Sequence, residues 1–302
     1  MFALTQLLHR LSAQESVSLA TFSTMKVGGK AKYLVNISNI NELCTLQKAL
    51  YEYGENYYIL SGGSNTLFSD HGFAGVIIKL SAAFDYTKTL SDNNIEVGAK
   101  TSYARITKLF LSLGEQSALG WLGTPGLVGG ALRMNAGSSL GVIGDVVESI
   151  TGVYNGTLQN INKSELVFSY RQNSLPKDFI ITSAVLKANN LCDEKELAKK
   201  ALSLKQKRLL TQPREHSLGS FFKNPLPFYA GKLIEDIGLK GFSIGGAQIS
   251  PVHANFIVNN AKANTSDIIK LAHEVHKKVM QKYNICLEPE IKLIGESWEF
   301  LK

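Results

Sequence analysis

Three segments of this chain contain more glycine than their length requires, and they limit the folds that it can adopt. They span residues 27–31, 61–66 and 120–137. Glycine allows the backbone a positive φ and a close approach to a ligand, and successive amides in such turns can point into one concavity suited to phosphate oxygens. We therefore expect loops that wrap an extended diphosphate ligand. The alternative for any one segment is a plain tight turn.

These glycine segments do not match the two common nucleotide-binding motifs. The chain has no Gly-x-x-x-x-Gly-Lys-Ser/Thr sequence, which argues against a P-loop nucleoside triphosphatase. It also has no Gly-x-Gly-x-x-Gly sequence between a strand and a helix, so a dinucleotide crossover fold is unsupported. The glycine loops are expected to belong to a different fold.

Hydrophobic periodicity and turn residues predict a mixture of helices and strands. Helices are expected at residues 41–52, 101–113, 192–210, 230–237 and 266–283, the last after the start signal Asn264-Thr265-Ser266-Asp267. The helix at 192–210 is expected to be amphipathic. Strands are expected at residues 57–60, 75–80, 95–98, 149–154 and 180–187, around 248, at 256–258 and at 285–293. This order predicts an α+β fold rather than one doubly wound parallel sheet.

Length and composition are those of a soluble globular protein. The 302 residues suffice for two or three packed lobes, with 44% hydrophobic and 19% charged residues. No apolar run reaches the roughly 18 residues that a membrane helix needs, and the N-terminus has no signal-peptide features, so we expect a cytoplasmic protein. Neither the three scattered cysteines nor the pair His273 and His276 forms a ligand set, so no disulfide framework and no metal site are expected.

The net charge of +7 is compatible with three interpretations. They are an ordinary basic surface, a cleft that collects an anionic ligand such as a nucleotide diphosphate, and a nucleic-acid-binding surface. The one basic cluster, within residues 199–208, is typical of the solvated face of a helix. Charge alone does not distinguish these alternatives.

Two of the glycine segments resemble the FAD-binding loops of a known flavoprotein family. Ser61-Gly62-Gly63-Ser64-Asn65 resembles the pyrophosphate-binding turn of flavoproteins whose FAD lies between two α+β subdomains. The segment from Gly123-Thr124-Pro125-Gly126 to Asn135-Ala136-Gly137 resembles the second flavin-contacting loop of the MurB family, the UDP-N-acetylenolpyruvoylglucosamine reductases. The order and spacing of both loops match, and the resemblance extends over nearly the whole chain.

The resemblance implies a three-lobed α+β flavoprotein that binds FAD without a covalent link. FAD-binding subdomain 1 is expected at residues 1–80, with the C-terminal strand 293–302 as a further candidate member. Subdomain 2 is expected at residues 81–198 and a substrate-binding domain at 199–292. The residues assigned to FAD are Ser61, Gly62, Gly63, Ser64, Asn65, Gly123, Thr124, Pro125, Gly126, Gly130, Asn135, Ala136 and Gly137.

Three further segments match catalytic positions of the family. They are Tyr170-Arg171, Gly219–Pro225 and Leu287–Lys292. Without the family, they have ordinary explanations: a surface pair, a turn into a buried strand and a solvated edge. The family instead implies that FAD, reduced by NADPH, passes a hydride to the methylene carbon of UDP-N-acetylglucosamine enolpyruvate. The product is UDP-N-acetylmuramate, a peptidoglycan precursor.

The resemblance also implies roles for individual residues. Ser220 matches the proton donor, Arg171 can contact the substrate carboxylate at two points, and Glu290 matches the third catalytic position. Candidate partners of the UDP moiety are Tyr170, Lys223, Asn224 and Lys292, with Lys26 and Arg214 as further candidates.

The chain departs from the family pattern in two places. Family members usually have serine two residues after the catalytic arginine, where this chain has Asn173 followed by Ser174. The span from Arg171 to Ser220 is too short for the tyrosine-bearing insertion of one subgroup. The resemblance is therefore to the subgroup that lacks this insertion.

Two alternatives remain open beside the reductase. One is another FAD-dependent oxidoreductase with the same FAD lobes, although such enzymes generally lack the Gly219–Pro225 and Leu287–Lys292 segments together. The other is a non-enzymatic module that binds nucleotides or nucleic acid, without a chromophore and with strong salt dependence. The reductase interpretation predicts a monomer whose partner is a UDP-sugar, without nucleic-acid or membrane partners.

Overall fold

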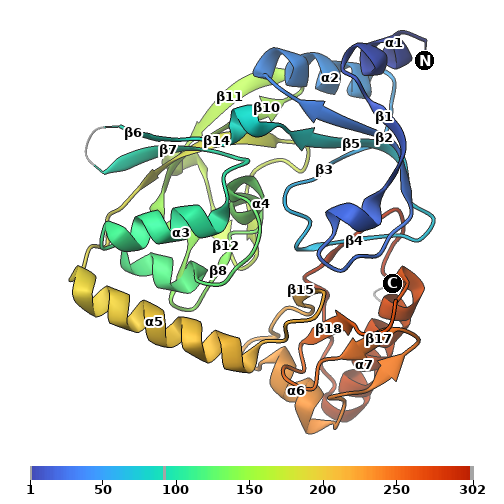
Figure 1. Ribbon diagram of the computed structural model, residues 1–302, viewed down its shortest axis with the longest axis vertical. Coiled ribbons are helices and arrows are strands. Elements are labelled where there is room, and N and C mark those ends of the chain that lie inside the picture. Colours follow the sequence, from blue (N-terminus) through green and yellow to red (C-terminus); the bar gives the residue numbers. More distant parts are fainter. Residues whose placement is uncertain (1, 91–92, 300–302) are drawn as a thin grey trace. The chain divides into compact units, whose positions relative to one another are not determined.

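The computed structural model describes residues 2–90 and 93–299, which form two compact units (Figure 1). Unit 1 comprises residues 1–14, 33–62 and 75–208, and unit 2 comprises residues 15–32, 63–74 and 209–302. The mixture of helices and sheets confirms the predicted α+β class. The division into three functional parts stays a prediction, and residues 300–302 of its C-terminal strand lie outside the described residues.

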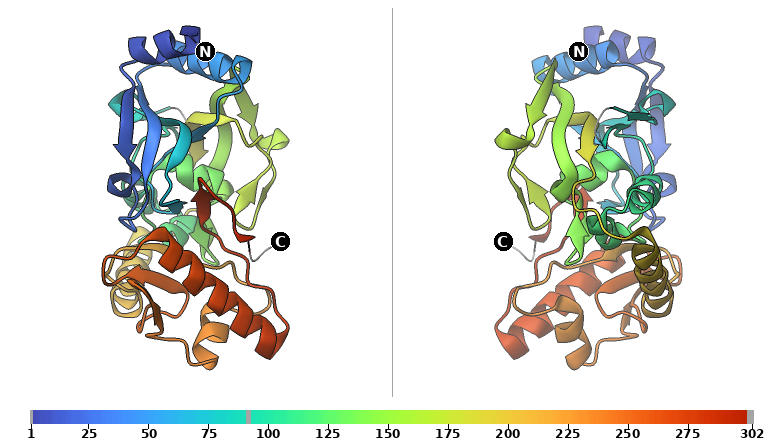
Figure 2. Two further views of the ribbon diagram at one scale, coloured as in Figure 1. Left: turned by 90° about the vertical axis from the view of Figure 1, so that its right-hand side faces the viewer. Right: turned by 90° about the vertical axis from the view of Figure 1, so that its left-hand side faces the viewer.

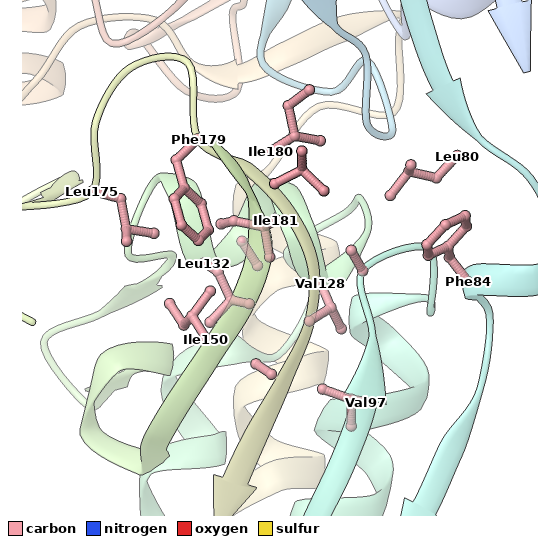
Figure 3. Packing of buried hydrophobic residues seen from close by; sticks show 14 of the residues in the cluster. Leu80, Phe84, Val97, Val128, Leu132, Ile150, Leu175, Phe179, Ile180 and Ile181 are labelled. Carbon is pink, nitrogen blue, oxygen red and sulfur yellow. The ribbon is translucent and has the colours of Figure 1, made fainter. Parts of the chain in front are cut away.

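Unit 1 contains a five-stranded antiparallel sheet of order β11-β10-β14-β7-β6. Its strands are β6 (Thr87–Thr89), β7 (Asn94–Gly98), β10 (Val147–Tyr154), β11 (Thr157–Asn162) and β14 (Ile180–Lys187). Helix α4 (Val128–Arg133) packs against β14 and β7, and α3 (Tyr103–Ser112) packs against α4. Figure 3 shows the apolar side chains that fill this core, among them Val128 and Leu132 of α4 beside Ile150 and Ile181 of the sheet.

A second sheet has the strand order β1-β2-β5-β3. It consists of β1 (Gln14–Ser18), β2 (Lys30–Ile37), β5 (Phe73–Leu80) and β3 (Tyr57–Ile59), and β3 runs parallel to β5. Strands β1, β2 and β5 each contain a unit boundary. In unit 1, helices α1 (Phe2–Arg10) and α2 (Ile40–Glu52) pack together, and α2 buries Leu43, Leu46 and Leu50 at helical spacing.

Unit 2 contains a four-stranded antiparallel sheet of order β15-β18-β17-β16. Its strands are β15 (Ser217–Ser220), β16 (Ser243–Ile244), β17 (Ala247–Ile249) and β18 (Phe256–Asn259). Helix α7 (Thr265–Tyr283) packs on this sheet (Figure 2). Its buried stripe includes Ile268, Leu271 and Val275. The shorter α6 (Ala230–Asp236) packs against α7, and β19 (Lys292–Ile294) pairs in parallel with β4 (Thr66–Phe68).

Two sequence predictions differ from the structure. The strand predicted at 285–293 is wrong except at its end, because β19 begins only at Lys292. Before it, Pro289 forms an isolated bridge with Phe222, and proline has no N–H to continue a ladder. Helix α5 (Glu194–Thr211) forms as predicted. Of its residues, however, only Leu197 is buried, and Leu210 is 81% exposed. Its expected apolar face is therefore not buried.

The described helices contain no candidate for a membrane span. Within residues 2–90 and 93–299, none of them combines the length and the hydrophobicity that crossing a bilayer requires.

The start of α7 provides a first testable prediction. Asn264 Oδ1 accepts the Asp267 N–H at 2.8 Å, and Asp267 Oδ2 accepts the Asn264 N–H at 3.2 Å. Because Asn264→Ala removes the cap, it is expected to lower the free energy of unfolding by about 1 kcal/mol. Urea denaturation measures this loss. The exposed loop residue Asn190 supplies the control Asn190→Ala, and equal stability of the two variants would contradict the prediction.

Candidate active site

Two predicted FAD loops meet within unit 1. A Cβ added to Gly62 would lie 2.9 Å from the Cα of Gly126, and a Cβ added to Gly130 would lie 2.9 Å from Ser61 Oγ. At Gly62 the contact is with backbone and leaves no room for a side chain, while at Gly130 a side chain would force the Ser61 hydroxyl to move. The turn after β3 and the segment that leads into α4 therefore lie against each other, which periodicity alone could not predict.

Ser61 supplies a polar atom suited to a ligand at this contact. Its Oγ is buried and has no hydrogen-bond partner among the described residues. Buried hydroxyl groups in native proteins are normally satisfied, because an unsatisfied one carries a desolvation penalty. A phosphate oxygen placed against this turn would satisfy the Ser61 hydroxyl, so the arrangement fits a diphosphate group.

The predicted turn 61–65 is divided between the units. Ser61 and Gly62 belong to unit 1, while Gly63, Ser64 and Asn65 belong to unit 2. Gly63 has φ +65°, and a Cβ there would lie 1.8 Å from the main-chain oxygen of Phe22. This position therefore requires glycine.

Asn135 ties the second glycine loop to the hairpin that carries Arg171. Its Nδ2 donates to the Ser169 oxygen at 3.0 Å, and its Oδ1 accepts the Gly144 N–H at 3.0 Å. The hairpin consists of β12 (Phe168–Ser169) and β13 (Gln172–Asn173). The buried amide of Asn135 therefore shapes the loop, and its expected contact with FAD stays a prediction.

Arg171 occupies the tip of this hairpin with φ +60°. Its Nη1 donates to the Gly137 oxygen at 2.9 Å, and its guanidinium carbon lies 5.4 Å from the centre of the Tyr170 ring, within cation–π range. The side chain is partly buried. Arg171 is therefore oriented by the second glycine loop and by the neighbouring tyrosine.

Asn173 has a structural role at the position where the family usually has serine. Its Nδ2 donates to the main-chain oxygens of Leu132 at 2.8 Å and Arg133 at 3.2 Å. Its Oδ1 accepts the Leu175 N–H at 3.0 Å. Asn173 thus closes the C-terminal end of α4 and holds the hairpin against it, which explains how the departure is tolerated.

Arg208 is a further cation of unit 1 that the sequence interpretation missed. It was expected on a solvated helix face, but it is partly buried, and a Cβ on Gly123 would lie 2.8 Å from its Nη1. Burial lowers the pKa of the Arg208 guanidinium, and the positive charge of Arg171 lowers it further. An arginine still remains protonated at neutral pH, so this side of the loop favours an anion.

In unit 2, Ser220 and Glu290 are linked through one main-chain residue. Ser220 ends β15, and the next residue, Phe221, accepts the Glu290 N–H at its main-chain oxygen at 2.8 Å. Asn65 Nδ2 donates to the main-chain oxygen of Glu290 at 3.2 Å, and the main-chain oxygen of Asn65 accepts the Lys292 N–H at 3.0 Å. The structure therefore brings together three segments that the sequence assigned to FAD binding, proton transfer and catalysis.

Ser220 lines a pocket of about 280 Å³ within unit 2. The predicted substrate residue Asn224 lines it as well, together with Tyr229, Lys240 and His253. Burial lowers the pKa of His253, and its Nδ1 accepts the Asn255 N–H at 3.2 Å. The imidazole is therefore expected to be neutral, with its proton on Nε2.

The other proposed UDP contacts have different surroundings. Lys223 Nζ forms an exposed ion pair with Glu288 at 3.0 Å, and Asn224 Oδ1 accepts the Ala230 N–H at 3.0 Å. Lys26 and Arg214 are exposed and are not among the residues that line the pocket. Of the three predicted catalytic residues, Ser220 and Glu290 belong to unit 2 and Arg171 to unit 1.

Comparison with known proteins independently supports the family resemblance. Residues 212–294 match the family model described as UDP-N-acetylenolpyruvoylglucosamine reductase, C-terminal domain. The UDP-N-acetylenolpyruvoylglucosamine reductase of Halalkalibacterium halodurans is 38% identical over 281 residues, covering 92% of this chain and 93% of that protein. The protein of the same name from Chlamydia trachomatis is 37% identical over 286 residues, covering 94% and 96%.

A solved structure agrees with these relatives. The crystal structure of UDP-N-acetylenolpyruvylglucosamine reductase (MurB) from Thermus caldophilus superimposes with a TM-score of 0.79 at 33% identity. The match covers 92% of this chain and 98% of that one. Identity of this degree over nearly the full length of the relatives shows common ancestry, and the chain belongs to the UDP-N-acetylenolpyruvoylglucosamine reductase family of oxidoreductases.

Proposed function

We propose that this chain reduces UDP-N-acetylenolpyruvoylglucosamine to UDP-N-acetylmuramate, with bound FAD and with NADPH as electron donor. The observation that carries the proposal is the arrangement of Ser220 and Glu290, which are joined through Phe221 beside the pocket that Ser220 lines. The relatives that match more than nine-tenths of the chain are named for this reaction. We further propose that the protein is a monomer, that it lies in the cytoplasm and that it takes part in peptidoglycan synthesis.

The FAD site fits the residues that are present. Ser61 offers a buried hydroxyl that has no partner among the described residues, and it lies beside Gly62 and Gly130 where the two loops meet. Ser61 to Asn65 and the segment from Gly123 to Gly137 are proposed to hold the cofactor. When bound, FAD supplies the hydride, and the protein supplies binding and orientation.

Arg171 is proposed to bind the enolpyruvyl carboxylate. A guanidinium group can donate two parallel hydrogen bonds to a carboxylate and stabilise negative charge that develops there during the reaction. Its contacts with the Gly137 oxygen and the Tyr170 ring orient the group before substrate arrives. Preorientation of this kind avoids reorganisation during the chemical step.

Ser220 is proposed to protonate the carbon next to the carboxylate. A serine hydroxyl is a weak acid, so it can act here only because the developing carbanion is strongly basic. Glu290 is proposed to hold or share a proton beside the same enol-like intermediate. The main chain of Phe221 follows Ser220 and accepts the Glu290 N–H, so it joins the two residues within unit 2.

Retention of FAD is expected to depend on Gly62. The Cβ of Gly62→Ala would overlap Gly126, and overpacking of this kind costs about 1–3 kcal/mol. Because relief of this overlap would displace the turn from the proposed cofactor site, the affinity for FAD is expected to fall about tenfold or more. The loss is measured as flavin absorbance per protein after gel filtration and as the melting temperature with and without added FAD.

A matched glycine controls for general destabilisation. Gly54 has φ +61° and no atom within 4 Å of an added Cβ, so Gly54→Ala strains the backbone without a clash. It is expected to lower the melting temperature but to retain FAD. Equal FAD content in both alanine variants would remove the Gly62 turn from the cofactor site.

A visible absorption spectrum of the purified protein, recorded under anaerobic conditions, tests the whole proposal. A flavin band that bleaches with NADPH and returns with UDP-N-acetylenolpyruvoylglucosamine establishes both half-reactions and the substrate. A band that bleaches and does not return would favour another FAD-dependent oxidoreductase. Absence of any band after addition of FAD would contradict the flavoenzyme and favour a nucleotide-binding module.

A further inference from the structure

Asn255 holds the main chain directly after Ser220. Its Oδ1 accepts the Phe222 N–H at 2.9 Å, and its Nδ2 donates to the Phe222 oxygen at 2.8 Å. The main-chain oxygen of Asn255 also accepts the Phe221 N–H at 2.7 Å. One residue thus engages both residues that follow the proposed proton donor.

The side-chain contact requires a carboxamide. Asn255 is 4% exposed and Phe222 is 1% exposed, so a main-chain group that lost its partner here would have no access to water. The carboxamide of Asn255 satisfies one donor and one acceptor of Phe222 at the same time. A carboxylate of the same shape could accept from the N–H, but it would place its second oxygen against the Phe222 oxygen.

Glu290 depends on the same short segment from its other side. The main-chain oxygen of Phe221 accepts the Glu290 N–H at 2.8 Å, while the N–H of Phe221 donates to Asn255. Phe221 is also the chain neighbour of Ser220. A shift of Phe221 would therefore move Ser220 and Glu290 together.

We propose that Asn255 is a positioning residue for the proton-transfer half of the reaction: its carboxamide fixes the main chain of Phe222, and thereby the adjoining Phe221 that links Ser220 and Glu290. The inference rests on the function proposed above, because it takes Ser220 as the proton donor. Misplacement of a catalytic group by about 1 Å can lower a rate about a hundredfold. Hydride transfer from NADPH to the flavin involves neither Ser220 nor Glu290, so it should not depend on Asn255.

The isosteric change Asn255→Asp tests the inference with the intact, FAD-loaded protein. Reduction of the flavin by NADPH is expected to stay within about twofold of wild type, while its reoxidation by the enolpyruvyl substrate slows about tenfold or more. A second readout is independent of turnover. Amide hydrogen exchange at Phe222 and Glu290 is expected to accelerate, because repulsion between the introduced carboxylate and the Phe222 oxygen displaces this segment and weakens both hydrogen bonds.

Asn259, at the end of the strand β18 that begins directly after Asn255, provides a matched control. Its Nδ2 donates to the Met25 oxygen at 3.0 Å, and its Oδ1 accepts the Ala263 N–H at 2.8 Å. Asn259→Asp therefore removes the same kind of donor from unit 2. Its side chain bonds to Met25 and Ala263 rather than to the residues directly after Ser220. It is expected to lower the melting temperature and to leave reoxidation at the wild-type rate.

A double-mutant cycle separates this inference from the proposed function. If Asn255 acts through Ser220, the effects of Ser220→Ala and Asn255→Asp on reoxidation are expected to be strongly non-additive. If Ser220→Ala is slow while Asn255→Asp reoxidises at the wild-type rate, only the role of Asn255 is overturned. Equal slowing of reoxidation in Asn255→Asp and Asn259→Asp would also overturn that role. Wild-type reoxidation in Ser220→Ala would instead refute the proton-donor assignment, and the inference with it.

Discussion

Ser220→Ala is expected to leave flavin reduction by NADPH unchanged and to slow flavin reoxidation by the enolpyruvyl substrate about a hundredfold or more. The variant lacks the hydroxyl that we propose as proton donor. Reduction by NADPH needs no proton from this residue. Stopped-flow absorbance of the flavin measures the two half-reactions separately.

The position of Ser220 makes this change a clean test. The serine ends β15 and pairs with Phe256, while the buried Phe221 and Phe222 fix the chain that follows. Because these are main-chain contacts, alanine should keep them. Ser217→Ala, at the other end of β15, is the control and is expected to behave as wild type. Equal losses in both half-reactions of Ser220→Ala would contradict the role in proton transfer.

Arg171→Lys is expected to slow reoxidation by the substrate about a hundredfold and to leave reduction by NADPH nearly unchanged. Lysine keeps the positive charge but has no planar fork for a carboxylate. It also loses the geometry with which Arg171 Nη1 contacts the Gly137 oxygen and the guanidinium lies beside Tyr170. The expected signature is a selective loss in the second half-reaction at saturating NADPH.

An exposed arginine supplies the control for this second variant. Arg105 forms a surface ion pair with Asp85 at 3.0 Å in unit 1 and also contacts Thr87 Oγ1, so Arg105→Lys makes the same chemical change at an exposed side chain. It is expected to retain both half-reactions, because exposed ion pairs contribute little. Unchanged turnover of the substrate by Arg171→Lys would remove Arg171 from the site.

Local sequence signals predicted the elements that form by local rules. Helix α7 shows an apolar repeat and a capping sequence at Asn264, and both operate within a few residues of chain. Strand β14 was predicted with its observed bounds because its apolar run is long and β-branched. Helix α4 was missed because Gly129 and Gly130 have low helix propensity, and packing against the sheet stabilises it instead.

The glycine loops mark the limit of prediction at the site. The sequence predicted which segments would bind a diphosphate, since glycine at a positive φ is a local requirement, as at Gly63. It could not indicate that Ser61 meets Gly130, because residues so far apart come together only through the packing of the whole unit. The same holds for Arg208, whose surroundings a helical pattern does not reveal.

By itself, the sequence predicted the α+β class from local periodicity, and motifs of adjacent residues carried the family resemblance that makes Ser220, Arg171 and Glu290 the catalytic candidates. Only the tertiary structure decided how Ser220 and Glu290 are joined. The two are far apart in sequence, and their connection runs through hydrogen bonds to the main chain of Phe221. The role of Asn255 could be inferred only from the tertiary structure, because a single asparagine before an apolar strand forms no sequence pattern. Its role follows from the contact of its carboxamide with the buried backbone of Phe222.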